Sequence, residues 1–226
     1  MNINATRQSD MVSGLLAEYA LGGLSTPARV LVESHLELSP HAERWLDDIH
    51  ALGSTLASKA GKSAKPYEPH VFDQIEPVSF KDSESALQSI FATIDAGEIA
   101  KASTPKALEQ FLGMPVADVP WKRVMPGLAE YKLPDMEGSE ISLLRIDGGK
   151  AMPVHTHHGS EVTLVLQGGF SDGNGHYGVG DIAYADDDVN HKPIADAGEI
   201  CICFAVADAP VELTGPIGRL MNSFIR

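Results

Sequence analysis

The stretch Pro153–Phe170 reads PVHTHHGSEVTLVLQGGF and places three histidines and a glutamate in seven positions, just before an apolar run. In an extended strand, side chains two positions apart share a face, so His155, His157 and Glu161 would project to the same side. His158 would point away from them. An imidazole pair with a nearby carboxylate can bind one metal ion at about 2 Å per bond. This stretch therefore predicts a metal site at the start of a β-strand.

A fourth ligand is expected from a later part of the chain. His191 follows GVGDIAYADDDVN, and a strand and a turn of this length would return it beside the first strand of an antiparallel barrel. His176 is the competing candidate, but its glycine-rich segment SDGNGHYG is typical of an exposed turn. Several polar side chains converging on one interior face would be costly without a partner. We therefore predict a metal centre made of His155, His157, Glu161 and His191.

The chain from Trp121 onward has an apolar period of two, which is typical of β-strands. Its alternating segments are EISLLRI, SEVTLVLQG, GHYGVGDIAYA, EICICFAVA and APVELTG. Glycine and aspartate turns separate these segments, and no helical pattern lies between them. Short strands at this spacing predict a β-sandwich or a small barrel.

The first 61 residues instead show helical spacing and helix-start signals. Thr26 stands before Pro27 and Ser39 before Pro40, and each pair fits an N-cap followed by proline at the first helical position. Three helices are expected: one after Asp10 that ends at the glycine pair 22–23, one from about Pro27 to Leu38, and one from Pro40 to about Ala60. We therefore expect an α+β protein in which a small helical bundle precedes the β domain.

A fourth helix is expected over about 83–97, after the linker-like stretch SKAGKSAKPYEP. Its Leu87, Ile90, Phe91 and Ile94 are spaced as one apolar stripe. The stripe could fold back onto the first three helices or lie in a partner's groove, and the two roles are compatible. The expected organisation is a helical domain (1–61), a linker with connecting helices (62–120) and a β domain (121–226).

Charge and cysteine content narrow the functional class. Lysine and arginine total 17 against 31 aspartates and glutamates, a net charge of -14, so direct nucleic-acid binding is not expected and a basic protein partner would be attracted. Cys201 and Cys203 lie on one face of an expected strand, where a disulfide is geometrically poor. We interpret them as reduced, packed thiols, with a redox switch as the alternative. No signal-peptide core or membrane-length apolar segment is seen, so we expect a cytoplasmic protein.

At the histidine-rich stretch the sequence resembles the cupin superfamily. Gly149, His155, His157, Glu161 and Gly168 fit its first motif, G-x5-H-x-H-x3-E-x6-G, without a gap. Gly180 and His191 stand for the second motif, although its usual proline before the glycine and asparagine after the histidine are absent. The resemblance implies a three-histidine, one-glutamate metal centre inside a small β-barrel of the double-stranded β-helix type.

The whole chain also resembles the ChrR-type zinc anti-sigma factors. The segments that carry this resemblance are LLAEYALGGLS, LVESHLELS, EVTLVLQGGF, GDI, CICFAVADAP and SFIR. It is weakest over about 62–120. In that family a small helical domain sequesters an extracytoplasmic-function sigma factor, and a C-terminal cupin senses stress.

One departure from the family concerns the helical domain. The family's H-x3-C-x2-C zinc motif falls on His35, Ser39 and Ala42, and its early histidine falls near Asp10. Serine and alanine are not zinc ligands, so no zinc is expected there unless His35, His41 and Asp10 improvise a site. His35 would otherwise be a helix-surface or capping residue. We expect the helical domain to fold by packing of side chains such as Leu15, Leu31 and Trp45.

The resemblance implies an anti-sigma factor whose cupin reports oxidative stress, such as singlet oxygen or organic peroxides. The apolar side chains expected to contact the sigma factor are Leu15, Leu16, Tyr19, Leu87, Ile90, Phe91 and Ile94. The cupin would hold one divalent metal, with zinc favoured over iron, manganese or nickel. No catalytic residue is expected.

Two alternatives stay open. Two histidines and a carboxylate are also the ligand set of non-haem iron oxygenases, so the cupin could be a metal-dependent enzyme. Alternatively, the helices could form a dimerisation module, and the protein would then be a stable homodimer that binds no sigma factor.

Overall fold

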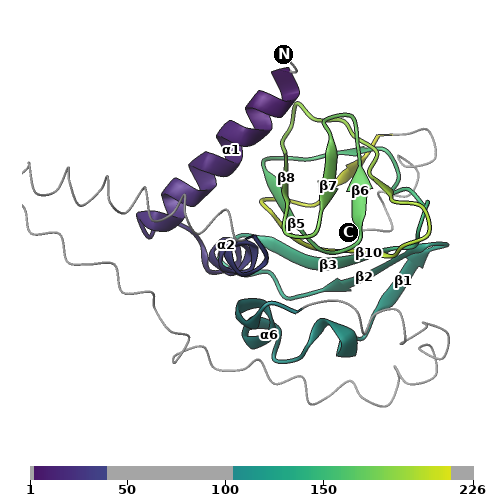
Figure 1. Ribbon diagram of the computed structural model, residues 1–226, viewed down its shortest axis with the longest axis horizontal. Helices are drawn as coiled ribbons and strands as arrows, with labels where there is room; N and C mark the ends of the chain where they lie inside the picture. The colour runs from purple at the N-terminus through teal and green to yellow at the C-terminus, as the bar shows by residue number, and fades with distance from the viewer. Residues whose placement is uncertain (1–2, 40–103, 215–226) are drawn as a thin grey trace, which may run out of the picture.

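The computed structural model describes residues 3–39 and 104–214, and in these the helices lie against a β-sandwich (Figure 1). The helices predicted over 40–60 and about 83–97 lie outside the described residues. The described helical segments are α1 (Ile3–Ala20), α2 (Thr26–Leu38), α6 (Lys106–Leu112) and a short 3-10 helix, η1 (Val116–Asp118).

Helix α1 begins at Ile3, earlier than the start predicted after Asp10. Aspartate is a capping signal but is also tolerated inside a helix, and no proline or glycine interrupts the residues before it. The helix ends as predicted, with Gly22 at a left-handed φ of 71°. This longer α1 brings residues before Asp10 to the surface of the β domain.

The start of α2 is close to the prediction, but the cap is different. The N-cap residue is Ser25 instead of Thr26, and its side chain makes no capping hydrogen bond. The carboxylate of Glu137, from the β domain, accepts hydrogen bonds from the backbone N–H and the hydroxyl of Thr26 at 2.8 Å each. The helix is therefore capped by a tertiary contact, which local sequence does not reveal.

The β domain is built around one six-stranded antiparallel sheet in the order β1-β2-β3-β10-β5-β8. Its strands are β1 (Lys122–Met125), β2 (Leu128–Lys132), β3 (Glu140–Ile146), β5 (Glu161–Gln167), β8 (Ile182–Ala185) and β10 (Cys201–Ala207). A three-stranded sheet orders β7 (His176–Gly178), β6 (Gly169–Ser171) and β9 (Ile194–Ala195), and a pair joins β11 (Glu212–Leu213) to β4 (His155–Thr156). The five alternating segments of the sequence all contain strands.

The six-stranded sheet separates two hydrophobic layers. The large side chains of β10, such as Phe204, pack with Val30 and Leu31 of α2 and Leu108 of α6. Leu31 is completely buried in this layer, so it stabilises the helix against the sheet. The packing expected of Leu31 is therefore seen, and its partners include side chains of the β domain.

A side chain of α2 also joins this helix to the beginning of α6. The Glu37 carboxylate of α2 accepts hydrogen bonds from the backbone N–H groups of Lys106 and Ala107, both at 2.9 Å. These N–H groups open α6 and have no partner within that helix. Glu37 thus joins two helices that are far apart in the sequence.

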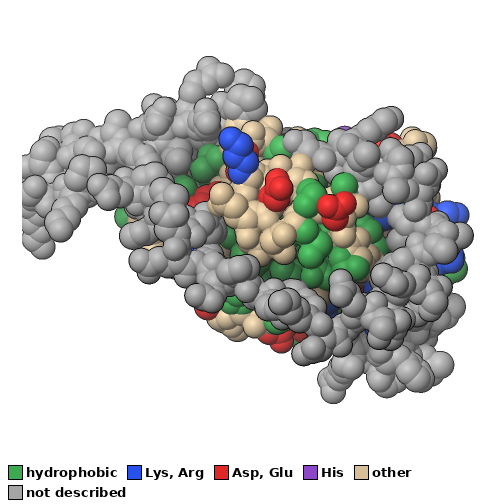
Figure 2. Space-filling view, turned by 90° about the horizontal axis from the view of Figure 1, so that it is seen from below, with side chains coloured by type: hydrophobic (Ala, Val, Ile, Leu, Met, Phe, Trp, Pro, Cys, Tyr) green, Lys and Arg blue, Asp and Glu red, His purple; other side chains and the backbone are tan. Residues whose placement is uncertain are grey.

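The surface of the described residues is mixed. In the view from below, acidic side chains stand among exposed hydrophobic ones (Figure 2). None of the helices in the described part of the chain is long and apolar enough to cross a membrane.

Candidate metal centre

Backbone pairing brings the distant histidine to the first two. His155 lies on β4, and its backbone exchanges two hydrogen bonds of 3.1 Å with His191, thirty-six residues later. This bridge places His191 beside the strand that carries His155, which is the position that its spacing in the sequence suggested. His155 and His157 are both 1 % exposed, so the site lies inside the sandwich.

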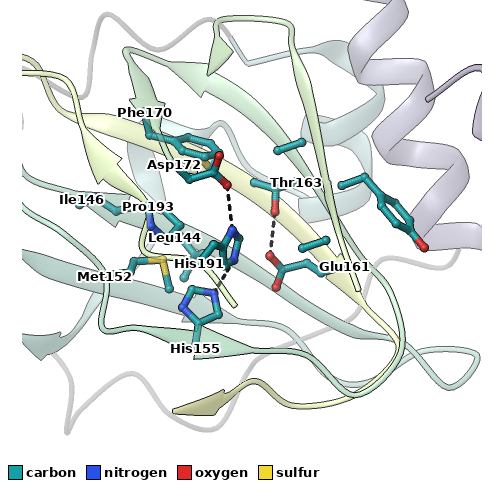
Figure 3. A pocket seen from close by; sticks show the side chains of 14 residues that line it. Leu144, Ile146, Met152, His155, Glu161, Thr163, Phe170, Asp172, His191 and Pro193 are labelled. Carbon is teal, nitrogen blue, oxygen red and sulfur yellow. Dashed lines mark hydrogen bonds and ion pairs between the residues drawn. The ribbon is translucent and has the colours of Figure 1, made fainter. Parts of the chain in front are cut away.

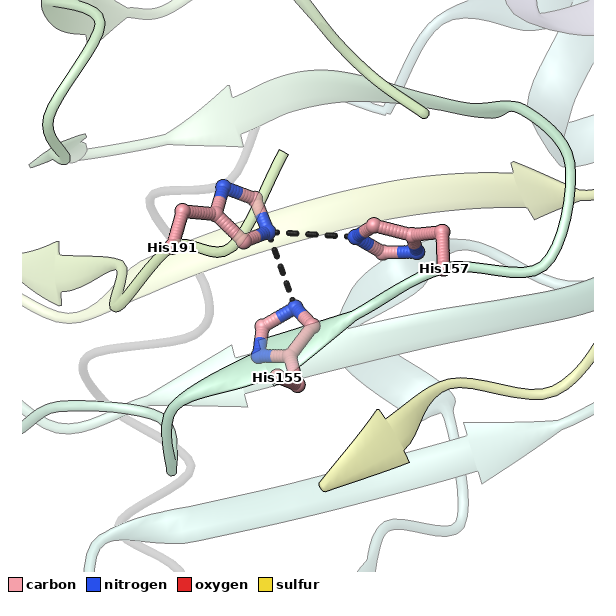
Figure 4. A group of neighbouring side chains, drawn as sticks. All are labelled: His155, His157 and His191. Carbon is pink, nitrogen blue, oxygen red and sulfur yellow. Dashed lines mark hydrogen bonds between the residues drawn. The ribbon is translucent and has the colours of Figure 1, made fainter. Parts of the chain in front are cut away.

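The three imidazole rings point their Nε2 atoms at one another (Figure 4). The Nε2 of His191 lies 2.9 Å from that of His155 and 3.1 Å from that of His157. Two nitrogens bound tetrahedrally to one zinc ion at about 2.0–2.1 Å would be roughly 3.3 Å apart. The triad of His155, His157 and His191 therefore fits a metal ion after only small shifts. Among the described residues, these three side chains form the group whose ligand atoms lie close enough together to hold a metal ion.

Hydrogen bonds on the far side of two rings fix which nitrogen faces the ion. The Nδ1 of His155 donates to the carbonyl oxygen of Pro153 at 2.8 Å, because a carbonyl can only accept. The Nδ1 of His191 donates to the Asp172 carboxylate at 2.9 Å. Each ring thus keeps an unprotonated Nε2 for a metal, as in other histidine metal sites.

Asp172 was not predicted as a site residue. Its side chain is 2 % exposed and follows β6 in a tight turn. Burial by itself raises the pKa of Asp172, but hydrogen bonds from His191 and from the N–H groups of Asn174 and Gly175 hold the pKa below its usual range. Asp172 is therefore a charged carboxylate that orients His191. In the sequence it is one of several turn aspartates, and nothing local distinguishes it.

Both buried histidines of the 155–157 segment are neutral at physiological pH. Burial lowers the pKa of His155 to about 4, assisted by the neighbouring His191. The pKa of His157 falls to about 4 for the same two reasons. Neutral imidazole is the form that binds metal, so the pocket favours the binding-competent state.

Glu161 lies beside His155 and His191 (Figure 3) and does not belong to the triad. One of its carboxylate oxygens accepts a hydrogen bond from the hydroxyl of Thr163 at 3.1 Å, and the other lies 3.7 Å from Nδ1 of His157. Its side chain lines the same small cavity as His155 and His191, a space of about 20 Å³. The structure thus brings three of the four predicted ligands together and leaves the role of Glu161 as a fourth ligand a prediction.

The two other histidines of this region lie at the surface. His158 points away from the triad and lies 2.9 Å from the Glu212 carboxylate, with 66 % of its side chain exposed. His176 lies 2.8 Å from Asp196 and is also exposed. Neither side chain reaches the triad.

The two cysteines are free and buried on β10. Their sulfur atoms are 3.5 Å apart, too far for a bond, and Cys203 lines the metal cavity. The hydrogen bond with Cys201 and burial raise the pKa of Cys203 well above its usual value. A thiol with a raised pKa is a poor nucleophile, so the structure favours packing for this pair.

The apolar side chains expected to meet a sigma factor are partly placed. Leu16 and Tyr19 of α1 are buried in a small cluster with Val32 of α2, and Leu15 packs at its edge. The stripe from Leu87 to Ile94 lies outside the described residues.

His35 does not behave as a surface or capping residue. It is buried, and its Nδ1 donates to the carbonyl oxygen of Gly180 at 2.6 Å, which joins α2 to the β domain. Burial lowers the pKa of His35. Ser39 is the C-cap residue of α2, and Ala42 lies outside the described residues.

Comparison with known proteins gives consistent results. Residues 109–210 match the ChrR cupin-like domain. The chain is 32 % identical over 219 residues to the anti-sigma-E factor ChrR of Cereibacter sphaeroides, covering 94 % of this chain and 95 % of that protein. It also matches the crystal structure of Rhodobacter sphaeroides SigE in complex with the anti-sigma ChrR, with 34 % identity, a TM-score of 0.61, and coverage of 87 % of this chain and 96 % of that one. The predicted fold, helices followed by a cupin domain, is confirmed.

Proposed function

Because the chain belongs to the ChrR family of anti-sigma factors, we propose that it binds an extracytoplasmic-function sigma factor through its N-terminal helices and releases it under control of the cupin. The observation that carries this proposal is similarity along almost the whole chain to a protein whose crystal structure is a complex with SigE. That relative is a regulator and not an enzyme, and we infer the same for this chain. The sigma factor and its regulator would meet in the cytoplasm.

An in vitro transcription assay tests this function directly. The purified chain should inhibit transcription by RNA polymerase that carries its cognate extracytoplasmic-function sigma factor, and leave transcription with the housekeeping sigma factor unchanged. Inhibition of both, or of neither, would contradict a specific anti-sigma role.

The side chains of α1 that we propose to contact the sigma factor are apolar. Leu16 and Tyr19 form a cluster with α2, and the nearby Leu21 is 86 % exposed. We propose that Leu15, Leu16 and Tyr19 contact the sigma factor, together with the stripe of Leu87, Ile90, Phe91 and Ile94. Since Leu16 and Tyr19 are buried, sigma binding by these residues requires α1 to separate from α2.

The same helix is attached to the cupin. Gln8 donates its side-chain amide to the carbonyl of Ile182 at 2.8 Å and accepts from the backbone N–H of Tyr184 at 3.2 Å. β8 is the last strand of the six-stranded sheet, so Gln8 occupies its otherwise free edge. Arg7 adds an ion pair of 2.5 Å with Asp186, worth at most about 1 kcal/mol at the surface. A sigma factor would therefore compete with the cupin for α1.

The contact between α1 and β8 is connected to the metal centre through a single turn. β8 continues into the turn Asp186–His191, which ends at a triad ligand. Asp187 accepts a hydrogen bond from the N–H of Gly159, and Thr156 donates its hydroxyl to the carbonyl of Val189 at 3.1 Å. The turn 186–191 thus contacts the segment that carries His155 and His157. Its first residue, Asp186, forms an ion pair with Arg7 of α1. We propose that a change at the metal centre moves this turn and alters the hold on α1.

The finer parts of the function rest on family resemblance. We propose that the metal is zinc and that the signal is oxidative stress, as singlet oxygen or an organic peroxide. We also retain the division into a helical domain (1–61), connecting segments (62–120) and a cupin domain (121–226) as a proposal, with α2 and α6 docked on the cupin sheet.

A further inference from the structure

One face of β10 carries only small side chains. Cys201, Cys203, Ala205 and Ala207 alternate along this strand with Ile202, Phe204 and Val206. The large set packs under the helices, and the small set faces the interior of the sandwich. Protein interiors are normally filled to crystal-like density, so a strand lined with small residues leaves space beside it.

That space is a cavity of about 140 Å³, which we call the chamber. Ala205 and Ala207 form part of its wall, and their strand partners Ser142 and Glu140 on β3 form another part. An engineered apolar cavity of about 150 Å³ in another protein holds one benzene molecule. The chamber therefore has the capacity for one six-membered ring.

The chamber adjoins the metal centre. Leu144, Met152 and Glu161 line both the chamber and the small cavity that contains His155 and His191. Figure 3 shows these three side chains in the wall of the small cavity. Ala207 pairs in register with Glu161 across the sheet. A molecule in the chamber would thus lie against the Glu161 carboxylate, on the border of the metal site.

The charged groups of the chamber select against anions. Three carboxylates, those of Glu130, Glu140 and Glu161, line it together with one cation, Lys132. Lys132 is already paired with Glu140 at 3.2 Å. Burial raises the pKa of Glu130, and the Ser142 hydroxyl is a further polar group in the wall of the chamber. These groups suit a ligand that donates a hydrogen bond and carries no negative charge.

We propose that the chamber binds a neutral, ring-sized organic molecule whose hydroxyl group donates to Glu161. The apolar ring would lie over Ala205 and Ala207, and the hydroxyl would lie at the border of the metal centre. The proposal concerns the cupin domain alone and requires no sigma factor. Its failure would leave the proposed anti-sigma function untouched, and the reverse also holds.

The test is a titration of the full-length, zinc-loaded protein with benzyl alcohol and, in parallel, with benzoate. Binding is followed by NMR through the methyl groups of alanines. Benzyl alcohol should shift the Ala205 and Ala207 methyl resonances and reach saturation. Benzoate has the same ring but a negative charge, and it should bind at least about tenfold more weakly.

A matched pair of variants locates the site. Ala205→Leu fills the chamber and should weaken benzyl alcohol binding at least about tenfold, while Val179→Leu, on an exposed turn away from the chamber, should bind as the wild type does. Circular dichroism and zinc content check that each variant is folded. If Ala205→Leu does not fold, Ala207→Val provides the same test with a smaller addition.

Three results would overturn the proposal. The first is the absence of saturable binding by benzyl alcohol. The second is benzoate binding as tightly as the alcohol, which would refute the ligand class. The third is a folded Ala205→Leu protein that binds like the wild type, which would place the ligand outside the chamber.

Discussion

At the scale of single residues, two buried hydrogen bonds hold the rings of His155 and His191 in place. Pro153 contributes a backbone carbonyl and Asp172 a carboxylate, and both occupy the Nδ1 side of a ring. The Nε2 atoms of His155 and His191 then point at each other, 2.9 Å apart. This arrangement reduces the reorganisation that metal binding requires.

Removing a triad ligand should strongly weaken metal binding. His155→Ala leaves two nitrogens where three converge, and we expect zinc affinity to fall by more than about 100-fold. Competition against a chelator of known affinity measures this loss. His158→Ala is the control, because His158 points away from the triad. Equal zinc affinity in the two variants would show that the ligand assignment is wrong.

Replacing the orienting carboxylate should have a smaller but clear effect. Asp172→Asn keeps the shape but removes the charge that orients His191, and zinc affinity should fall about 10–100-fold. Asp196→Asn, which disturbs the exposed pair with His176, serves as the matched control and should change zinc affinity little. Should Asp172→Asn bind zinc as the wild type does, Asp172 has no role in positioning His191.

The low pKa of His157 makes the stability of the metal-free protein depend on pH. Its pKa is about 4 when folded and about 6.5 when unfolded, so between these values the unfolded chain binds a proton that the folded chain does not. The free energy of unfolding should therefore decrease as pH falls from 6.5 to 4, by on the order of 3 kcal/mol from this residue.

Urea unfolding in the presence of a chelator, at several pH values in this window, measures the dependence. His157→Gln should make this pH dependence shallower by the contribution of His157, because glutamine does not titrate, while His155 keeps its own contribution. An identical pH dependence in wild type and variant would contradict the burial of a neutral His157.

The sequence was most informative about residues that alternate within a strand. The orientations of His155, His157 and His158 were predicted from the parity of an extended segment, although β4 itself covers only His155–Thr156. Asp172 could not be found in this way, because its contact with His191 depends on how two turns meet in three dimensions. The same is true of His35, whose partner Gly180 belongs to the other half of the chain.

At the scale of elements, the attachment of α1 to β8 should be adjustable. Arg7→Ala removes the ion pair with Asp186 but not the contacts of Gln8, so α1 should detach more often while the cupin stays folded. Amide hydrogen exchange in α1 should accelerate several-fold, and affinity for the sigma factor should rise modestly, because less of the helix is held by the cupin.

Arg123→Ala is the control for loss of one exposed arginine elsewhere on the surface. Unchanged exchange in α1 after Arg7→Ala would mean that the ion pair does not hold the helix. Faster exchange together with weaker sigma binding would contradict competition between the cupin and the sigma factor.

Helix boundaries were less predictable than strand positions. β3 and β10 coincide with the alternating segments because successive side chains of a strand face opposite sides of the sheet, which gives the sequence a period of two. The early start of α1 was not visible, since the residues before Asp10 carry no strong preference and gain their order in contact with β8. The cap of α2 by Glu137 is likewise a tertiary feature.

At the scale of the whole molecule, helices and cupin share one hydrophobic layer. Val30 and Leu31 of α2 are fully buried with Phe204 of the cupin sheet, so the two parts are physically coupled. A truncation that removes α2 would expose this layer. Point variants on α1 are therefore cleaner probes of sigma binding than deletion of the helical domain.

The central claim is that this chain sequesters an extracytoplasmic-function sigma factor through α1. The most direct measurement is co-purification of the tagged full-length chain with the sigma factor of this class encoded nearest to it, repeated with Leu15→Glu and with Val179→Glu as a surface control. We predict a one-to-one complex with the wild type and with Val179→Glu, and a much weaker one with Leu15→Glu. A wild-type chain that is folded, metal-loaded and unable to bind the sigma factor would contradict the account.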